Sequence, residues 1–205
     1  MILHRPFEAV APTLDGDVLL VLGRAETAFT GGDLARLIPH ASEDGVRKAA
    51  QRLVAQGLVT LERVGRAYNY RLNREHLVAD AVLDIARARE RLGERVQEHV
   101  RGWAATPESV LLFGSAARGE MRADSDLDLL VVADHDAVAD EDVDGLATAV
   151  SAWTGNDARV VHLSPAEVRD AFRAGDDLMT ELLAEGQVLH GPARYLQQVR
   201  REAAS

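Results

Sequence analysis

Cysteine is absent from all 205 positions of the sequence. Its absence excludes disulfide bonds, thiol nucleophiles and cysteine-ligated zinc sites, and it agrees with a reducing compartment. The chain also has no run approaching the roughly 18 apolar residues of a membrane-spanning helix, and its first residues lack the apolar core of a signal peptide. These absences predict a cytoplasmic protein, and a hydrophobic content of 47% predicts a globular one.

Positive charge is also scarce: Lys48 is the single lysine, and the formal net charge is −10. The deficit is not evenly spread. Residues 1–80 contain ten basic and ten acidic side chains, whereas residues 81–205 contain thirteen basic and twenty-three acidic ones. Within residues 42–75, seven basic side chains outnumber four acidic ones, a local excess of three positive charges. The two parts of the chain are therefore expected to bind different partners.

The first third of the chain has the pattern of three short helices. An apolar run over 18–26 is long enough for one helix, and Asp33, after a Thr-Gly-Gly turn, can open a second. From Ser42 onward, apolar residues recur at helical spacing, and Gly57 is a natural helix stop.

Two segments of alternating polarity follow, residues 58–64 and 67–73, and their connection across Gly65 predicts a β-hairpin. Three helices and then a hairpin is the element order of a winged helix-turn-helix domain. Over about residues 13–75 the chain resembles the winged-helix DNA-binding domains of bacterial regulators. The resemblance implies that a recognition helix enters the major groove while the hairpin, or wing, reaches the backbone or the minor groove.

The polar and basic residues on these two elements are the candidate DNA contacts. They are Arg47, Lys48, Gln51 and Arg52 on the predicted recognition helix, and Arg63, Arg66 and Arg71 in the wing. The alternative is a protein–protein module whose arginines only solvate one face. We expect DNA binding, because the basic residues cluster on the two elements that would contact the duplex.

Residues 76–105 have a helical pattern with apolar positions near a seven-residue repeat. A helix of this length would extend about 40 Å, either as one rod or with a break near Gly93. Its apolar stripe either packs on the sheet of the next domain or forms a coiled dimer seam, and Arg89 at an inward position favours packing on the sheet. Winged-helix regulators usually bind two half-sites as dimers, so a homodimer is expected by analogy.

A short apolar strand over 109–113 leads into Gly114 and Ser115, and the residues after them can start a helix. This arrangement aims backbone N–H groups, a hydroxyl and a helix N-terminus at one point, which suits a triphosphate. Farther along, Asp126 and Asp128 stand two positions apart at the head of another apolar run, so both carboxylates project from one face of a strand. Paired carboxylates of this kind favour a hard cation such as Mg²⁺.

Two other phosphate- and cation-binding motifs fit poorly. The run that begins at Asp124 starts like an EF-hand loop, but Leu129 and His135 stand where that loop needs Gly and Glu. The run from Gly114 to Gly119 lacks the Lys-Ser or Lys-Thr pair that completes a P-loop.

Residues 107–192 resemble the nucleotidyltransferase superfamily of DNA polymerase beta, in particular the minimal nucleotidyltransferases. The likeness depends on Gly114, Ser115, Gly119 and the run Ser125-Asp126-Leu127-Asp128-Leu129. It implies a mixed sheet flanked by helices. It also implies nucleotide binding by one set of residues, namely Gly114, Ser115, Arg118, Gly119 and Ser125. Asp126 and Asp128 are then the catalytic residues and the ligands of two Mg²⁺ ions, with ATP as the expected substrate. For Arg118, a solvated helix arginine is the equal alternative.

One departure from the family pattern bears on activity. The resemblance implies a third carboxylate on a later strand, within residues 158–164, but alignment places Arg159 or Val161 at that position. Asp157, just before this strand, is the remaining candidate. An arginine among the carboxylates would compete with a metal ion for them.

The sequence therefore predicts an α/β (α+β) protein with three parts: a winged helix over 1–75, a connecting helix over 76–105 and a minimal nucleotidyltransferase domain over 106–205. The leading hypothesis is Mg²⁺-dependent transfer of a nucleoside monophosphate to a protein or small-molecule hydroxyl. Minimal nucleotidyltransferases often act as antitoxins, so a HEPN-type toxin is an expected acceptor. The alternative is a DNA-binding regulator whose degenerate transferase domain senses a nucleotide.

Overall fold

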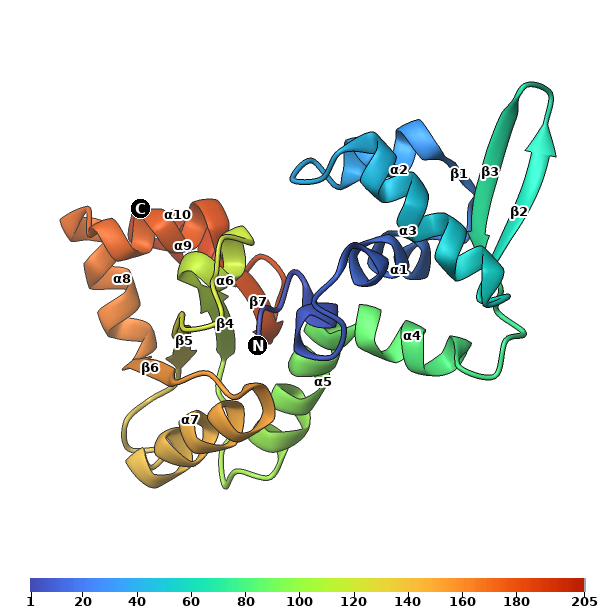
Figure 1. Ribbon diagram of the computed structural model, residues 1–205. Coiled ribbons are helices and arrows are strands. Elements are labelled where there is room, and N and C mark those ends of the chain that lie inside the picture. Colours follow the sequence, from blue (N-terminus) through green and yellow to red (C-terminus); the bar gives the residue numbers. More distant parts are fainter. Residues whose placement is uncertain (205) are drawn as a thin grey trace. The chain divides into compact units, whose positions relative to one another are not determined.

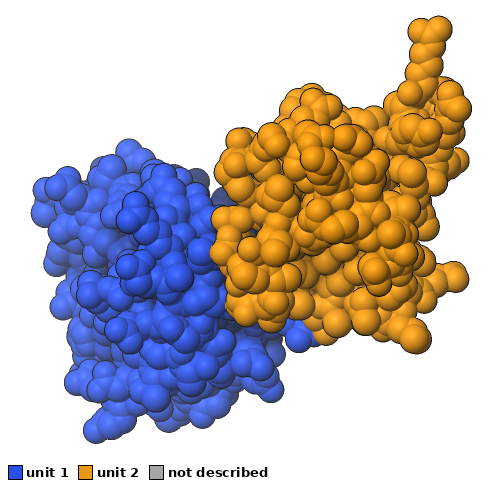
Figure 2. All heavy atoms as spheres, viewed as in Figure 1, with its two compact units in different colours: residues 1–4, 89–205 blue, residues 5–88 orange. Residues whose placement is uncertain are grey.

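The computed structural model describes residues 1–204 and divides the chain into two structural units (Figure 1, Figure 2). The N-terminal unit is Arg5–Ala88. The C-terminal unit consists of Met1–His4 together with the chain from Arg89 onward. Both units mix helices and strands, as the α/β prediction requires. No helix within residues 1–204 is long and apolar enough to cross a membrane.

The N-terminal unit contains five helical segments and a small antiparallel sheet. Its helices are η1 (Pro6–Ala9), α1 (Leu14–Arg24), α2 (Gly31–Leu37), α3 (Glu43–Ala55) and α4 (Ala79–Ala86). Its strands, in the spatial order β1-β3-β2, are β1 (Phe29–Thr30), β2 (Val59–Val64) and β3 (Ala67–Leu72). Local signals explain the helix ends: Thr30 and Asp33 form a capping box at the start of α2, and Gly57 adopts a φ of 75° just after α3.

The core of the N-terminal unit lies between α1, α3 and the base of the sheet, where Val18, Leu22 and Val46 are fully buried. The β2–β3 hairpin extends beyond this core (Figure 1). Tyr70 near its base is buried, but Tyr68, on the same face and nearer the turn, is half exposed. The turn end of the hairpin is therefore held by its own strand pairing and is open to solvent.

The segment predicted as a connecting helix forms two helices, α4 and α5 (Ala88–Arg101), with the break at Arg87 rather than near Gly93. The apolar residues of α4 pack in the N-terminal unit, whereas Leu92, Val96 and Val100 of α5 are buried in the C-terminal unit. The apolar stripe of α5 is thus covered by its own unit and is not available as a coiled dimer seam.

The C-terminal unit contains a four-stranded mixed sheet flanked by helices, which confirms the predicted architecture. The strands are β4 (Ser109–Phe113), β5 (Leu127–Val132), β6 (Ala158–Leu163) and β7 (Gln187–His190), in the order β6-β5-β4-β7. Only the β5–β6 pair is parallel. Besides α5, the helices are α6 (Gly114–Arg118), α7 (Asp140–Thr154), α8 (Pro165–Ala174), α9 (Asp177–Glu185) and α10 (Tyr195–Ala203).

Strand β5 is buried on both faces. Leu127 and Leu129 contact the core shared with α5 and α7, whereas Leu130 contacts the core shared with α8, α9 and α10 (Figure 1). Complete burial of each leucine stabilises the fold by about 1.5–3 kcal/mol, so the strand is firmly held. Because side chains alternate along a strand, Asp128 points to the same face as Leu130, toward the side of the sheet that carries α9.

Candidate active site

The two aspartates singled out in the sequence lie at the start of β5. Asp128 is the second residue of the strand and pairs with Phe113, the last residue of β4. Asp126 comes just before the strand, and its side chain keeps 29% of its surface exposed. Leu127, between them, is fully buried and holds both carboxylates at the solvent-facing end of the sheet.

Gly114 brings the other half of the motif against Asp128. It follows Phe113 directly and has a φ of 66°, a conformation that favours glycine. A Cβ atom at this position would come within 2.6 Å of the Asp128 carboxylate oxygen Oδ2. The Gly-Ser turn and the carboxylate pair, eleven or more residues apart in sequence, are therefore adjacent in the structure.

The carboxyl group of Asp128 is shifted toward its neutral form. Burial is the main cause and raises its pKa above the ordinary value; the nearby negative charges of Asp126 and Glu181 add to this, while Arg159 opposes it. A carboxylate held in this way gains from a cation nearby, which is the expected electrostatics of a cation-binding position.

Arg159 occupies the position where the resemblance implied a third carboxylate. In the parallel pairing of β5 and β6, Arg159 stands directly beside Asp128. Its guanidinium group forms an ion pair with Asp126, with 2.6 Å between Nη2 and Oδ2. Val161, the other aligned position, packs into the core beneath α8–α10. Asp157 is exposed before β6, and its main-chain carbonyl accepts a hydrogen bond from the N–H of Leu127.

The described residues fit one divalent ion better than two. Within residues 1–204 no cluster of three or more His, Asp or Glu side chains is placed to hold a metal ion. Asp126 and Asp128 can offer carboxylate oxygens to a single Mg²⁺, provided that Arg159 releases Asp126. The third carboxylate expected for a second ion is replaced by a cationic side chain.

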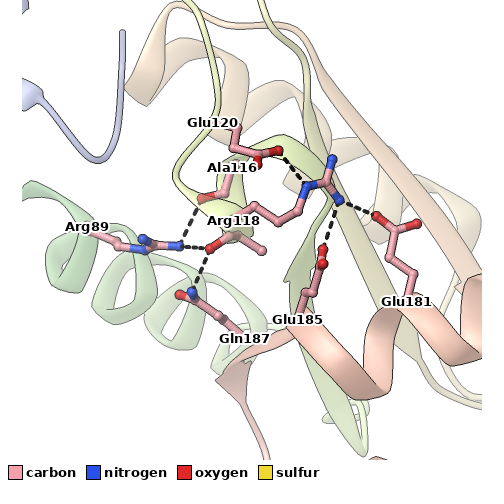
Figure 3. A network of polar contacts seen from close by, with 8 residues as sticks. Arg89, Ala116, Arg118, Glu120, Glu181, Glu185 and Gln187 are labelled. Carbon is pink, nitrogen blue, oxygen red and sulfur yellow. Dashed lines mark hydrogen bonds and ion pairs between the residues drawn. The ribbon is translucent and has the colours of Figure 1, made fainter. Parts of the chain in front are cut away.

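Arg118, a predicted phosphate contact, is surrounded by carboxylates (Figure 3). Its guanidinium group donates to Glu120 at 2.8 Å. It also donates to two carboxylates of α9, Glu181 at 2.7 Å and Glu185 at 2.9 Å. These hydrogen bonds raise the pKa of Arg118 above its ordinary value. A role at the phosphates would require Arg118 to exchange these partners.

Two residues that the sequence did not assign to the site bind main-chain carbonyl groups of α6 (Figure 3). Arg89 donates to the carbonyl oxygens of Ala116 and Ala117 at 2.9 and 3.1 Å, and Gln187 donates to that of Ala117 at 2.9 Å. These bonds satisfy carbonyl groups that the short helix leaves without partners. In the sequence, the inward position of Arg89 in an apolar stripe was the one sign that this residue has a structural role.

Gly119 and Ser125, predicted to belong to the nucleotide motif, shape the loop between α6 and β5. Gly119 ends α6 with a φ of 74°, and the hydroxyl of Ser125 accepts a hydrogen bond from the N–H of Arg122 at 2.7 Å. The buried side-chain amide of Asn156 donates to the carbonyl oxygens of Ala123 and Ser125. Together these contacts position the chain just before Asp126.

In the N-terminal unit, the candidate DNA contacts lie on the exposed side of α3 and along the hairpin. Arg47 and Lys48 both pair with Asp44, and Arg52 forms a two-pronged pair with Asp15 of α1, at 3.1 and 2.6 Å. Arg63 donates to the carbonyl oxygen of Gly65. The remaining candidates, Gln51, Arg66 and Arg71, are exposed.

Residues 87–174 match the family model of the nucleotidyltransferase domain, and the matched range contains the Gly-Ser turn and both aspartates. The match covers less than half of the chain and lies almost wholly in the C-terminal unit. It includes α5, although the sequence placed that segment in a connector. No curated protein matches the chain significantly.

The comparison with solved structures finds partial similarity to chains from toxin–antitoxin complexes. A toxin–antitoxin complex with AMP-PNP is 20% identical, with a TM-score of 0.42, over 55% of this chain and 83% of that chain. A chain of the complex between tri-AMPylated Shewanella oneidensis HEPN toxin and MNT antitoxin is 18% identical, with a TM-score of 0.39, over 56% of this chain and 82% of that chain.

The contact between Gly114 and Asp128 predicts a specific cost for a side chain at position 114. Gly155 offers a matched control, because it has a similar φ of 71° but a methyl group added there would meet no neighbouring atom within 4 Å. We expect Gly155→Ala to lose about 1–2 kcal/mol of unfolding free energy from backbone strain alone. Gly114→Ala should lose at least about 1 kcal/mol more from overpacking. Urea unfolding measures both, and equal losses would contradict the close approach.

The raised pKa of Asp128 predicts that its charge destabilises the fold. Stability from this group is lost as pH rises from the ordinary pKa of 3.8 through the raised folded-state value. We therefore expect Asp128→Asn to have a higher melting temperature than the wild type at pH 7, and the gain to vanish below about pH 3.8. Asp126→Asn, which removes the partner of Arg159, should show no such gain. Thermal unfolding across pH tests this, and a pH-independent difference would contradict it.

Proposed function

We propose that the C-terminal unit transfers a nucleoside monophosphate from a nucleoside triphosphate, with ATP as the expected donor, to a hydroxyl group of a protein or small molecule. One observation carries the proposal: within a matched nucleotidyltransferase domain, the Gly114 turn lies against Asp128, with Asp126 beside it. This combination places a candidate phosphate contact and a carboxylate pair within one small site.

Each part of the site has a role in this proposal. Gly114 lets a phosphate approach the main chain, and the hydroxyl of Ser115 donates to a phosphate oxygen. Asp126 and Asp128 hold Mg²⁺, which when bound neutralises the charge of the phosphates. The ionised form of Asp128, disfavoured by burial, is stabilised when a cation is bound.

The acceptor is proposed to be a protein. Minimal nucleotidyltransferases often act as antitoxins that modify a HEPN toxin, and the resemblance over residues 107–192 extends that expectation to this chain. The antitoxin proposal also gives the N-terminal unit a purpose, because antitoxins commonly repress their own operons. DNA binding and modification of a toxin are compatible in one chain.

A second candidate function is a DNA-binding regulator whose transferase domain binds a nucleotide without transferring it. The ion pair between Arg159 and Asp126 favours this candidate, because it places a cation where catalysis by two metal ions needs a carboxylate. The same N-terminal unit serves both candidates. They differ in whether bound nucleotide is consumed.

DNA binding by the N-terminal unit is supported by its topology and charge. Three helices precede a hairpin in a three-stranded antiparallel sheet, which is the order of a winged helix. Residues 42–75, which contain α3 and the hairpin, have an excess of three positive charges in a chain of net charge −10. A homodimer reading two half-sites remains part of this proposal.

Transfer is tested with α-labelled ATP, Mg²⁺ and the full chain, together with the product of a neighbouring toxin-like reading frame. We expect label on the acceptor and release of pyrophosphate, with both reduced at least about a hundredfold in Asp126→Asn and in Asp128→Asn. Asp170→Asn, an exposed carboxylate of α8, is the matched control and should retain activity. Nucleotide binding without label transfer would reject the enzyme and favour the regulator.

DNA binding is tested by fluorescence anisotropy with the DNA upstream of the protein's own gene at several salt concentrations. The double variant Arg47→Ala/Arg66→Ala should bind more weakly, and the slope of log affinity against log salt should fall by about 0.9 for each lost phosphate contact. Arg36→Ala removes an exposed charge of α2 in the same unit and serves as control. A slope equal to the wild type in the double variant would place the DNA contacts elsewhere.

A further inference from the structure

We propose that Arg159 is a tethered cation that closes the Asp126–Asp128 pair to divalent metal until the phosphates of a nucleotide draw its guanidinium group away. The inference rests on the proposed function for the identity of the ligand, a nucleoside triphosphate. It adds a regulatory step to the site: metal alone binds weakly, and metal binds more tightly together with nucleotide.

The first support is the position of Arg159 relative to both carboxylates. Its strand partner across the parallel pair is Asp128, and its guanidinium group is 2.6 Å from Asp126. Its charge also lowers the pKa of Asp128, against the raising effect of burial. One positive side chain thus interacts with both ligands of the candidate metal position.

Competition follows from charge and space. A divalent ion shared by Asp126 and Asp128 would compete with Arg159 for the carboxylate of Asp126, and it would be repelled by the guanidinium group nearby. A neighbouring positive charge typically lowers the affinity of a carboxylate for a proton by about 10- to 1000-fold. We expect an effect of the same kind on its affinity for a metal ion. Since the Arg159 side chain is 73% exposed, solvent screens the effect, and the lower end of that range applies.

Release by nucleotide follows from the exposure and chemistry of the same side chain. A largely exposed arginine on an edge strand can change rotamer without disturbing the core, and β6 is the edge strand of its sheet. Guanidinium groups bind phosphate oxygens through paired hydrogen bonds, and a triphosphate offers more negative charge than Asp126 does. Transfer of Arg159 from carboxylate to phosphate would free Asp126 for the metal.

Removal of the charge should therefore change metal and nucleotide binding in opposite directions. In Arg159→Gln we expect the affinity for Mn²⁺ alone, measured by the electron paramagnetic resonance signal of free Mn²⁺, to rise about tenfold. The affinity for a fluorescent non-hydrolysable ATP analogue in EDTA should fall about tenfold, because a charged hydrogen bond to phosphate is lost. Arg159→Lys, which keeps the charge, should bind Mn²⁺ as weakly as the wild type.

Two controls separate the site from the general acidity of the unit. Arg173→Gln removes an exposed arginine that pairs with Asp170 on α8, so it alters the net charge equally and should leave Mn²⁺ affinity unchanged. The double variant Asp126→Asn/Arg159→Gln should lose the gained Mn²⁺ affinity, which places the ion at the carboxylate pair. Circular dichroism confirms that each variant is folded.

The outcomes decide the inference independently of catalysis. Tighter Mn²⁺ binding in Arg159→Gln but not in Arg173→Gln, with weaker metal-free nucleotide binding, supports it even if no acceptor is ever labelled. Equal Mn²⁺ affinity in the wild type and Arg159→Gln overturns it, even if transfer is active. Equal gains in Arg159→Gln and Arg173→Gln also overturn it, because general charge would then explain the effect.

Discussion

The burial of β5 on both faces is the constraint on which the site depends. Leu127, Leu129 and Leu130 are held by two separate cores, so the strand cannot slide or rotate without exposing one of them. The strand also fixes the positions of the two aspartates, because Asp128 belongs to it and Asp126 directly precedes it. The same strand presents Asp128 to Gly114 on one side and to Arg159 on the other. The three parts of the site are thus brought together by the pairing of β5 with its two neighbouring strands.

Much of this arrangement could be predicted, because it is encoded in short-range patterns. The apolar run after Asp126 required a buried strand, and the alternation of side chains required both aspartates to share one face. A Gly-Ser turn was expected directly after a strand, and Gly114 follows β4 with a φ of 66°. The mixed sheet with flanking helices followed from the resemblance, and residues 87–174 match the family model of a nucleotidyltransferase domain. In the N-terminal unit, the order of helices and hairpin could likewise be derived from spacing and glycines.

Other parts could not be predicted, because they depend on which side chains meet across the fold. Arg118 was expected either to contact phosphate or to be a solvated helix arginine, but Glu181 and Glu185, one turn apart on α9, both accept hydrogen bonds from it. The break at Arg87 divides a continuous helical pattern, since α4 and α5 bury their stripes in different cores. The alignment left Arg159 and Val161 as equal alternatives for the third carboxylate position. Only the register of β5 and β6 shows that Arg159 is beside Asp128.

The charge distribution at the site explains why an arginine can stand among these carboxylates. Asp128 is partly buried near two other acids, Asp126 and Glu181, and burial already disfavours its ionised form. Without a cation, three negative groups would repel one another at the end of a rigid strand. Arg159 neutralises part of that charge in the free protein, as Arg118 does for the acids of α9. A bound metal ion could replace Arg159 in this role but could not act beside it without cost. The same positive charge that neutralises the carboxylate pair therefore limits what the site can bind.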